Sequence, residues 1–450
     1  MIVMKFGGSS VADAGCLRAV AELVQAHQQR APLVVLSAMG KTTNALFEAA
    51  QAAVTGSLDA ALAVYGRIVQ HHRRAAAELF ADRPPQALLD TLAAHFQELE
   101  LLLRGVALLR ELSPRSMDAI ASLGERLSTH LFAALAGATW VDARTILRTD
   151  NRFGEAQPDP PVVQEQARQL LAPLLGPGRL VVTQGYIGAT AAGLTTTLGR
   201  GGSDFSASLF GAALGAEEVQ IWTDVEGVMT CDPRLVPTAH PIAQLSFEEA
   251  AELAAFGAKV LHPATIQPAV EARIPVTVRH TGRPVGAYTT ITAHGDSGRS
   301  VAAIAAKAPL SVLTVASARM LDQSGYLARL FGVFGRHGVS VDSVATAETS
   351  VSLTVDADAE LEPLLAELRA FAAVSVARER GLVAVVGARL KHTPGLAAQL
   401  FGVVRDINIE MISMGANEIN LSFIVRAEDA PGCLKRLHAA LFENPAGGNP

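Results

Sequence analysis

The stretch Ile2-Val3-Met4-Lys5-Phe6-Gly7-Gly8-Ser9-Ser10 has the pattern of a buried β-strand that runs directly into a glycine turn. Its apolar run is too short for a typical helix and is apolar on both faces, which is typical of a parallel sheet covered by helices on each side. The pattern therefore predicts an α/β fold with a mostly parallel sheet sandwiched by helices. Similar short runs recur along the chain at Leu33–Ser37, Thr139–Ala143, Leu180–Tyr186, Val219–Thr223 and Val276–His280.

A region rich in alanine and leucine, about 44–136, lies between the second and third of these runs. We interpret it as several helices inserted beside the sheet. The pair Pro84-Pro85 predicts a break between them, because proline interrupts helices.

The composition is that of an ordinary globular protein. The chain has 450 residues, of which 50% are hydrophobic and 18% charged, so disorder, collagen and coiled coil are excluded. A net charge of −6 argues against nucleic acid and anionic membranes as partners. No signal peptide or transmembrane segment is predicted. Three distant cysteines, Cys16, Cys231 and Cys433, predict neither disulfides nor a zinc site and indicate a reducing, cytoplasmic compartment.

The C-terminal part contains an internal repeat, which follows a polar stretch, 284–299, interpreted as a linker. Leu330–Val333 recurs as Leu400–Val403 at an offset of 70 residues, and Val351–Val355 matches Ile419–Phe423 at an offset of 68. Each copy predicts a βαββαβ module, in residues 300–380 and 381–450, with 300–307 available to pair with the second. We expect contacts between repeats or subunits. The alternative interpretation is that the two modules are structural duplicates that pack together and bind no ligand.

The ends of the predicted strands indicate where a ligand would bind. Ligands of open α/β sheets lie outside the carboxyl ends of the strands. Small, polar or flexible residues follow several strands, at Lys5–Gly8, Ser37–Gly40, Thr183–Gly185 and Thr223-Asp224. Each could simply turn the chain, but together they favour a site at this edge.

The stretch Thr195-Thr196-Thr197-Leu198-Gly199-Arg200-Gly201-Gly202-Ser203-Asp204-Phe205-Ser206 precedes a helix of small residues. Its glycines let the backbone turn sharply and approach a ligand. Ser203 or Asp204 can cap the helix, whose N-terminus favours an anion. The planar guanidinium of Arg200 is suited to bind a carboxylate or phosphate. The alternative is a helix cap with a surface arginine.

Further charged residues have both a structural and a functional interpretation. Lys5 before two glycines suits nucleotide phosphates, although a surface turn is more common. Glu125, in an apolar helix start, needs either an internal cation such as Arg126 or a ligand amine. Arg234 and Lys259 could reach phosphates or lie on the surface. We find no Ser-His-Asp pattern, no dinucleotide-binding fingerprint and no metal-ligand spacing, so no metal site is predicted.

Taken in order, Lys5–Ser10, Ser122–Arg126, Thr196–Asp204 and Phe256–Pro263 resemble the signatures of aspartokinase (aspartate 4-kinase). The repeat resembles the tandem ACT domains of this branch of the amino-acid kinase family. The resemblance covers essentially the whole chain and implies residues 1–283 as catalytic domain, with no room for a fused homoserine dehydrogenase. It implies that ATP phosphorylates the β-carboxylate of L-aspartate to give 4-phospho-L-aspartate, the first step towards lysine, threonine and methionine.

The resemblance also implies residue roles. The β-carboxylate is already a nucleophile, so positioning and positive charge do most of the work. Lys5 and Asp204 are the expected catalytic residues, with Asp204 either orienting Lys5 or assisting Mg²⁺ that arrives with ATP. The expected aspartate-binding residues are Thr43, Glu125, Arg200, Gly201, Gly202 and Ser203. The expected ATP-binding residues are Lys5, Phe6, Gly7, Gly8, Thr223, Asp224, Met229, Arg234, Lys259 and Val260, where Met229 replaces an aromatic residue of many relatives.

For regulation, the resemblance implies a homodimer formed through the ACT modules and feedback by an amino acid, lysine rather than threonine. Gln323 and Ala347 depart from the expected effector pattern. The alternatives are a kinase for glutamate or acetylglutamate, and a non-catalytic ACT sensor. The expected effector residues are Met320, Gly325, Tyr326, Leu327, Ser340, Val341, Asp342 and Thr346.

Overall fold

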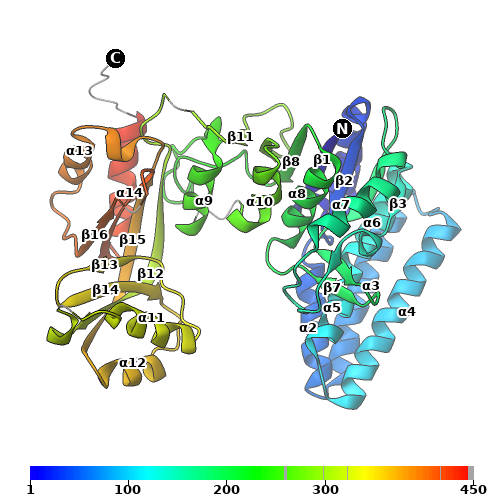
Figure 1. Cartoon of the computed structure of the whole chain (residues 1–450). Helices are drawn as coiled ribbons and strands as arrows, with labels where there is room; N and C mark the ends of the chain where they lie inside the picture. Colours follow the sequence, from blue (N-terminus) through cyan, green and yellow to red (C-terminus); the bar gives the residue numbers. More distant parts are fainter. Residues whose placement is uncertain (258–260, 297, 322, 416, 444–450) are drawn as a thin grey trace. The chain divides into compact units, whose positions relative to one another are not determined.

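The structure is a computed structural model that describes residues 1–257, 261–296, 298–321, 323–415 and 417–443. It contains two compact units, the first formed by 1–228 and 260–293 and the second by 229–259 and 294–450 (Figure 1). Among the described residues, no helix combines the length and apolarity needed to cross a membrane.

A largely parallel sheet forms the centre of the first unit. β1 pairs in parallel with β2 and β8, whereas β11 runs antiparallel to β10. All runs predicted as strands are strands, so the predicted sheet is confirmed. In spatial order the strands of this unit are β3 (Thr139–Val141), β5 (Val181–Gln184), β2 (Pro32–Leu36), β1 (Ile2–Phe6), β8 (Glu218–Thr223), β10 (Val276–His280) and β11 (Thr289–Thr292).

Strand β11 lies inside 284–299, the stretch interpreted as a linker. Thr289 and Ile291 are buried and alternate with the half-buried Thr290 and Thr292, and the Thr289 hydroxyl accepts the Val228 N–H at 2.8 Å. The linker interpretation overlooked this strand because its threonines look polar in sequence, although threonine favours the pleated, half-buried surface of a sheet.

The two faces of β1 are covered by different helices. Ile2, Met4 and Phe6 join the apolar core formed with α1 (Ala14–Ala26) and α6 (Leu123–Ala136). Because side chains alternate along a strand, Val3 and Lys5 point to the opposite face, which α8 (Gly202–Leu214) covers. The alternation therefore directs the Lys5 ammonium towards the start of α8. Helices α7 (Pro160–Leu170) and α10 (Pro263–Glu271) pack against α8.

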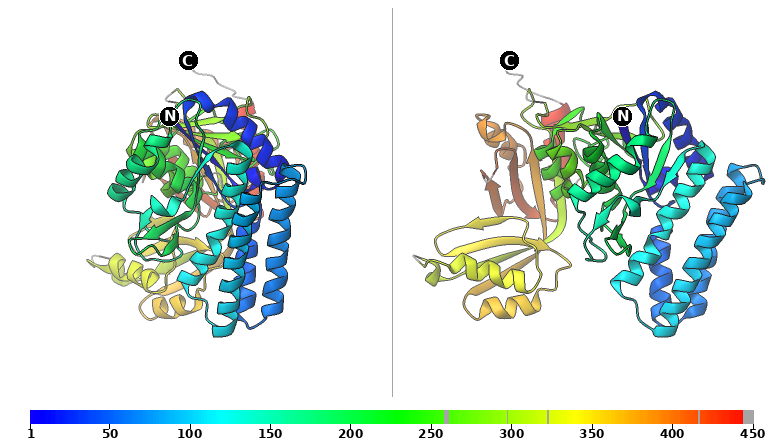
Figure 2. Two further views of the ribbon diagram at one scale, coloured as in Figure 1. Left: turned by 90° about the vertical axis from the view of Figure 1, so that its right-hand side faces the viewer. Right: turned by 45° about the vertical axis from the view of Figure 1, so that its right-hand side comes forward.

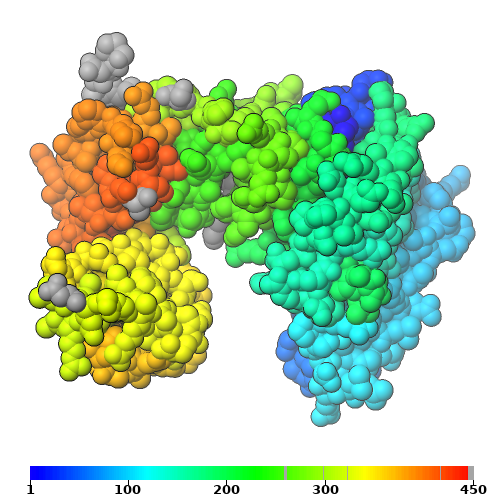
Figure 3. All heavy atoms as spheres, in the orientation of Figure 1, coloured from blue at the N-terminus to red at the C-terminus, as the bar shows by residue number. Residues whose placement is uncertain are grey.

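The inserted region is helical, as predicted. Helix α3 ends before Pro84-Pro85 and α4 begins after it, which confirms the predicted break. The α4 helix, cyan in Figure 3, buries apolar residues three or four positions apart, which is one face of a helix. These buried residues are Leu88, Leu92, Phe96, Leu99, Leu103 and Val106. The helices of the region are α2 (Thr42–Val54), α3 (Leu58–Leu79), α4 (Gln86–Leu109) and α5 (Pro114–Ala121).

A small second sheet accompanies the first and was not predicted. It consists of β4 (Arg148–Thr149), β6 (Ile187–Thr190) and β7 (Thr195–Thr197). Strand β7 is the first part of the glycine-rich stretch, so this sheet fixes where the glycine turn begins.

The second unit contains two ACT-like modules that share one six-stranded sheet (Figure 2). Two long strands run through both modules, and each module contains half of each strand. Leu310–Ala316 opens the first module, and Ala303–Lys307 pairs with Leu382–Val386 at the edge of the second. The strand order is β13 (Val344–Thr346), β14 (Ser350–Asp356), β12 (Ala303–Ala316), β15 (Ala373–Val386), β17 (Asn420–Arg426) and β16 (Met411–Met414). Both modules therefore have the split βαβ strand order. The last strand of the second module is Ala303–Lys307, which precedes the first module in sequence.

The helices repeat in the same way. Helices α11 (Tyr326–Arg336) and α12 (Glu362–Arg369) belong to the first module, and α13 (Leu396–Val403) and α14 (Ala430–His438) to the second. Val315 pairs with Val351, and Val385 pairs with Leu421, so β14 and β17 take the same place in the two modules. Helices α12 and α14 begin at Glu362 and Ala430, 68 residues apart, which agrees with the predicted two-residue gap.

Residues 229–259 pack with the second unit, although the sequence grouped them with the catalytic region. The segment includes β9 (Gln244–Ser246) and α9 (Phe247–Ala255). Thr230 accepts the Ile304 N–H at 2.8 Å, and its hydroxyl lies 2.9 Å from His438 Nε2. Cys231 and Val236 enter the core of the second module.

Candidate active site

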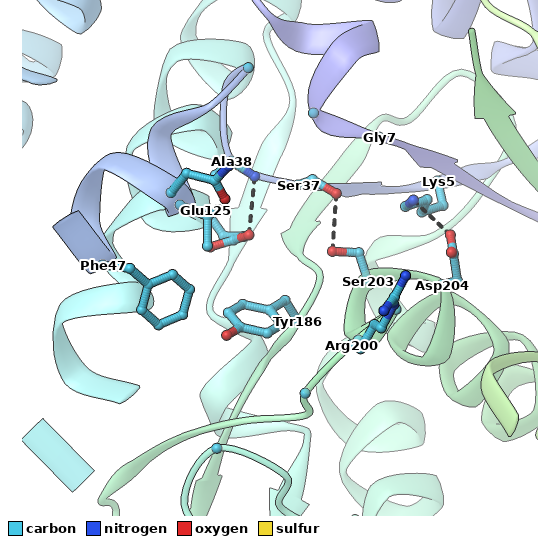
Figure 4. Close-up of a pocket in the computed structure, with 18 of the residues that line it drawn as sticks. Lys5, Gly7, Ser37, Ala38, Phe47, Glu125, Tyr186, Arg200, Ser203 and Asp204 are labelled. Atoms are coloured by element: carbon cyan, nitrogen blue, oxygen red, sulfur yellow. Dashed lines mark hydrogen bonds and ion pairs between the residues drawn. The ribbon is translucent and has the colours of Figure 1, made fainter. Parts of the chain in front are cut away.

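A pocket of about 650 Å³ opens at the carboxyl edge of the main sheet of the first unit (Figure 4). It brings together strand ends, the start of α8 and one face of α2, which are far apart in sequence. Of the residues predicted for catalysis and binding, it is lined by Lys5, Gly7, Gly8, Thr43, Glu125, Arg200, Gly201, Gly202, Ser203 and Asp204.

Lys5 and Asp204 form an ion pair in this pocket. Lys5 Nζ lies 2.6 Å from Asp204 Oδ1, and the side chains are only 10% and 15% exposed. Asp204 stands in the first turn of α8, where a carboxylate is favoured by the helix dipole. The pair holds the ammonium beside the backbone of Gly7, whose Cβ position would lie 3.7 Å from Lys5 Nζ.

The glycine-rich turn brings the backbone close to its neighbours. Gly201 has φ +72° and precedes α8, and a Cβ there would lie 2.7 Å from Thr265 Cγ2. A Cβ on Gly185, at the end of β5, would meet Ser203 at 2.7 Å. The Ser37 hydroxyl donates to Ser203 Oγ at 3.0 Å. The turn therefore seats the start of α8 against two strand ends, where no side chain larger than hydrogen fits without movement.

Glu125 is a buried carboxylate with an unfilled hydrogen-bonding position. Its side chain is 2% exposed, and Oε1 accepts the Ala38 N–H at 3.1 Å. Oε2 has no partner among the described residues. Burial raises the pKa of Glu125 to about 8, which the Ala38 hydrogen bond only partly opposes. The nearby Arg126 pairs instead with Glu98 at 2.9 Å, so the internal-cation interpretation of Glu125 is not supported.

Arg200 is exposed and forms no ion pair with any residue that the structure describes. Figure 4 shows its guanidinium and the Glu125 carboxylate on two sides of Tyr186. The pocket thus offers an anion-binding group and an ammonium-binding group together with the Lys5 ammonium. This set suits a small zwitterion that must meet a second anion.

Comparisons with known proteins agree with this chemistry. The amino acid kinase family matches residues 1–280, and an ACT domain matches residues 383–441. The lysine-sensitive aspartokinase 3 of Escherichia coli (strain K12) is 39% identical over 460 residues, which cover 98% of this chain and 99% of the relative. The chain belongs to the aspartokinases of the amino-acid kinase family.

One further relative and two crystal structures extend the likeness. The chloroplastic aspartokinase 1 of Arabidopsis thaliana is 39% identical, over 98% of this chain and 80% of that relative. The crystal structure of E. coli aspartokinase III in complex with aspartate and ADP (R-state) has a TM-score of 0.84 and 38% identity, over 98% of this chain and 100% of that chain. The lysine and aspartate complex (T-state) of the same enzyme has a TM-score of 0.81, 38% identity and coverage of 98% and 99%.

Several wall residues of this aspartokinase pocket were not predicted. Ser37, Ala38 and Gly40 belong to a strand end that the sequence did single out, but no role was assigned to them. Asn44 and Phe47 share a face of α2 with Thr43, a spacing that could have identified them. Tyr186 follows the β5 end with φ +68°, which is unusual for a residue with a side chain. The unpredicted lining residues are Ser37, Ala38, Gly40, Asn44, Phe47, Gly154, Glu155, Tyr186 and Gly199.

Some predicted nucleotide-binding residues do not line the pocket. The Phe6 side chain is fully buried in the core and stacks on Trp222, so only its backbone could face a nucleotide. Thr223 ends β8, beside β1, and Asp224 follows it; the Thr223 hydroxyl donates to Asp224 Oδ1 at 3.0 Å. Met229 and Arg234 belong to the second unit, where Arg234 pairs with Asp232 at 2.6 Å. Lys259 and Val260 lie outside the described residues.

The expected effector residues all lie in the first ACT module. Gly325 begins α11 with φ +84°, followed by buried Tyr326 and exposed Leu327. The Asp342 carboxylate lies 2.6 Å from Lys307 Nζ, which also contacts Asp356 at 2.6 Å. Met320 and Val341 pack against the module core, Ser340 is exposed, and Thr346 is in edge strand β13.

Proposed function

We propose that this chain transfers the γ-phosphoryl group of ATP to the β-carboxylate of L-aspartate, which gives ADP and 4-phospho-L-aspartate, the first step of lysine, threonine and methionine biosynthesis. The observation that carries the proposal is that Glu125 and Arg200 share one pocket, and that neither Glu125 Oε2 nor the Arg200 side chain has a partner among the residues the structure describes. These groups match the α-ammonium and α-carboxylate of an amino acid. The complex of the E. coli relative with aspartate and ADP supports this choice of substrates.

In the proposed complex, Arg200 binds the α-carboxylate and Glu125 binds the α-ammonium, with contacts from Thr43, Ser203 and the Gly201-Gly202 backbone. The β-carboxylate then points towards Lys5. Because this carboxylate is already a nucleophile, no general base is needed. The barrier comes from repulsion between two anions, so preorganised positive charge is the main catalytic contribution.

Lys5 would contact the transferring phosphoryl group, and the Gly7 and Gly8 amides would bind the phosphate oxygens. A Cβ on Gly8 would lie 3.0 Å from two carbonyl oxygens, Ala38 O and Gly40 O, so a larger residue would require the neighbouring backbone to shift. The Lys5–Asp204 pair supports the interpretation that Asp204 orients Lys5. Phe6, Thr223, Asp224, Met229, Arg234, Lys259 and Val260 remain our proposed nucleotide residues.

Mg²⁺ is proposed to enter with ATP. Mg²⁺ usually takes one or two carboxylates, the substrate phosphates and several waters. Asp204 fits this need, because its carboxylate lies in the pocket beside Lys5 and a carboxylate has a second oxygen besides the one nearest the ammonium. When bound, the ion would neutralise charge on the phosphates.

We further propose feedback by lysine at the first ACT module of a homodimer. The E. coli relative is lysine-sensitive, and its T-state structure contains lysine. In this chain the Asp342 carboxylate already contacts an ammonium group, that of Lys307. The edge strands expose Val344, Ile412 and Met414, which supports pairing between modules of two subunits. The free cysteines support a reducing, cytoplasmic location.

The direct test measures ADP formation with ATP and Mg²⁺ in the presence of aspartate, glutamate or acetylglutamate, followed by titration with lysine and threonine. We expect turnover with aspartate only, and inhibition by lysine at lower concentration than by threonine. Turnover with glutamate or acetylglutamate instead would favour another amino-acid kinase. Lysine binding without ADP formation would indicate a sensor and would contradict the proposal.

A further inference from the structure

Asp118 is a buried carboxylate that lies behind the pocket and does not line it. It is 2% exposed and comes from α5. Its Oδ2 accepts the N–H groups of Gly154 and Thr197, both at 2.9 Å, and its Oδ1 accepts the Thr197 hydroxyl at 2.7 Å. Among the described residues no cation pairs with Asp118, so these three hydrogen bonds offset the energetic cost of burying its carboxylate.

The donors belong to the two segments that form one wall of the pocket. Gly154 and Glu155 line the pocket directly, and Thr197 is followed closely by Gly199 and Arg200. The two segments also meet at the Ala156 N–H, which donates to the Thr197 carbonyl at 2.9 Å. Asp118 therefore binds both halves of the wall with one carboxylate.

The wall is closely packed where Asp118 holds it. Gly199 has φ +76°, and a Cβ there would lie 3.2 Å from the Gly154 carbonyl oxygen and from Glu155 Cγ. A small shift of either segment would change the start of the glycine-rich turn. The exposed Arg200 side chain has no protein partner among the described residues to hold it, so its position depends on this backbone.

We propose that Asp118 is a positioning residue that fixes the wall from which Arg200 reaches the α-carboxylate of aspartate. The link to aspartate rests on the proposed function, whereas the clamp itself rests only on the hydrogen bonds. Asp118 acts on the aspartate side of the pocket, because its bonds involve neither Lys5 nor the Gly7-Gly8 turn. Its removal therefore raises the KM for aspartate and leaves the KM for ATP nearly unchanged.

The test compares Asp118→Ala and Asp118→Asn with a control in the same helix. Ser113→Ala removes the N-cap of α5, whose Oγ accepts the Ser116 N–H at 3.2 Å, and among the described residues the Ser113 hydroxyl hydrogen-bonds to Ser116 alone. We expect Asp118→Ala to raise the KM for aspartate about tenfold, with kcat and the KM for ATP within about threefold. Asp118→Asn should restore most of the affinity, because its amide oxygen can accept both N–H groups and its NH₂ can donate to the Thr197 hydroxyl. Ser113→Ala should lower the melting temperature without changing either KM.

Hydrogen exchange of the Gly154 and Thr197 amides separates this proposal from the proposed function. Asp118→Ala should accelerate both amides whether or not the chain phosphorylates aspartate, and unchanged exchange would overturn the clamp. Accelerated exchange with an unchanged KM for aspartate in an active enzyme would overturn the link to Arg200. If Asp118→Ala does not fold, Thr197→Val removes the hydroxyl donor to Asp118, together with its contact to Tyr186, and keeps the Thr197 N–H. The KM for aspartate must then rise measurably but by less than about tenfold for the proposal to stand, and an unchanged KM would overturn it.

Discussion

The Lys5 ammonium lies 2.6 Å from the Asp204 carboxylate, although the two residues are nearly 200 positions apart in sequence. Alternation along β1 turns Lys5 towards α8, and the glycine turn places Asp204 in the first turn of that helix. The pair holds a cation at the edge of the sheet without leaving it fully exposed to water, where its field would be weakened.

Replacing Glu125 by glutamine should stabilise the empty protein. The pKa of Glu125 in the folded protein is about 8, against an ordinary value of 4.5, so between these values the folded state binds more protons than the unfolded state. The free energy of unfolding contributed by this group therefore falls as pH rises through that window. We expect Glu125→Gln to melt a few degrees above the wild type at pH 8, and the gap to shrink towards pH 5. A gap that is absent or grows on acidification would contradict this account.

The pH dependence of aspartate binding follows from the same group. Binding of an ammonium needs ionised Glu125, so below about pH 8 the empty site must first lose a proton. We expect kcat/KM for aspartate to rise between about pH 6 and 8. In Glu125→Gln this rise should disappear, and the affinity for aspartate should fall at least about tenfold. A parallel pH profile in the variant would assign the rise to another group.

A pair of glycine variants tests the close packing of the turn. Gly201 and Gly215 flank α8, both with positive φ, but only at Gly201 would a Cβ collide with a neighbour, Thr265. Gly215→Ala should cost about 1 kcal/mol of stability through backbone strain and leave kinetics unchanged. Gly201→Ala should also lose about tenfold or more in kcat/KM for aspartate. Equal kinetics in the two variants would show that the turn tolerates displacement.

The effector site can be tested with two aspartates that share one lysine. Lys307 contacts Asp342 and Asp356, but only Asp342 belongs to the expected effector set. Asp342→Asn should raise the lysine concentration for half inhibition at least about tenfold, whereas Asp356→Asn should change it less than about twofold. Similar shifts in both variants would indicate that loss of the Lys307 pair, and not of an effector contact, is responsible.

Local patterns were sufficient to predict the elements that carry the site. The Ile2–Phe6 strand and the glycine turn before α8 each have a signature within a few residues of sequence, whereas the segment around Glu125 left its partner open between an internal cation and a ligand amine. These signatures located the charged groups of the pocket, because strand ends of a parallel sheet meet at one edge.

The remaining wall residues depend on tertiary approach. Phe47 and Glu155 reach the pocket from α2 and from the segment between β4 and α7, and Tyr186 faces it from the turn after β5. Asp118 has no local signature, since its partners follow it by tens of residues. Likewise, nothing in the composition of 229–259 indicates that it packs with the second unit, because the bond of Thr230 to Ile304 is set by the assembled sheet.

The most direct measurement of the central claim is ADP formation against aspartate concentration for Lys5→Ala and Arg200→Ala, with Lys41→Ala as an exposed-lysine control. If Lys5 stabilises the transferring group and Arg200 binds the α-carboxylate, Lys5→Ala lowers kcat by about 100-fold or more, and Arg200→Ala raises the KM for aspartate with little change in kcat. The control should match the wild type. The reverse split, or full activity in Lys5→Ala, would contradict the account.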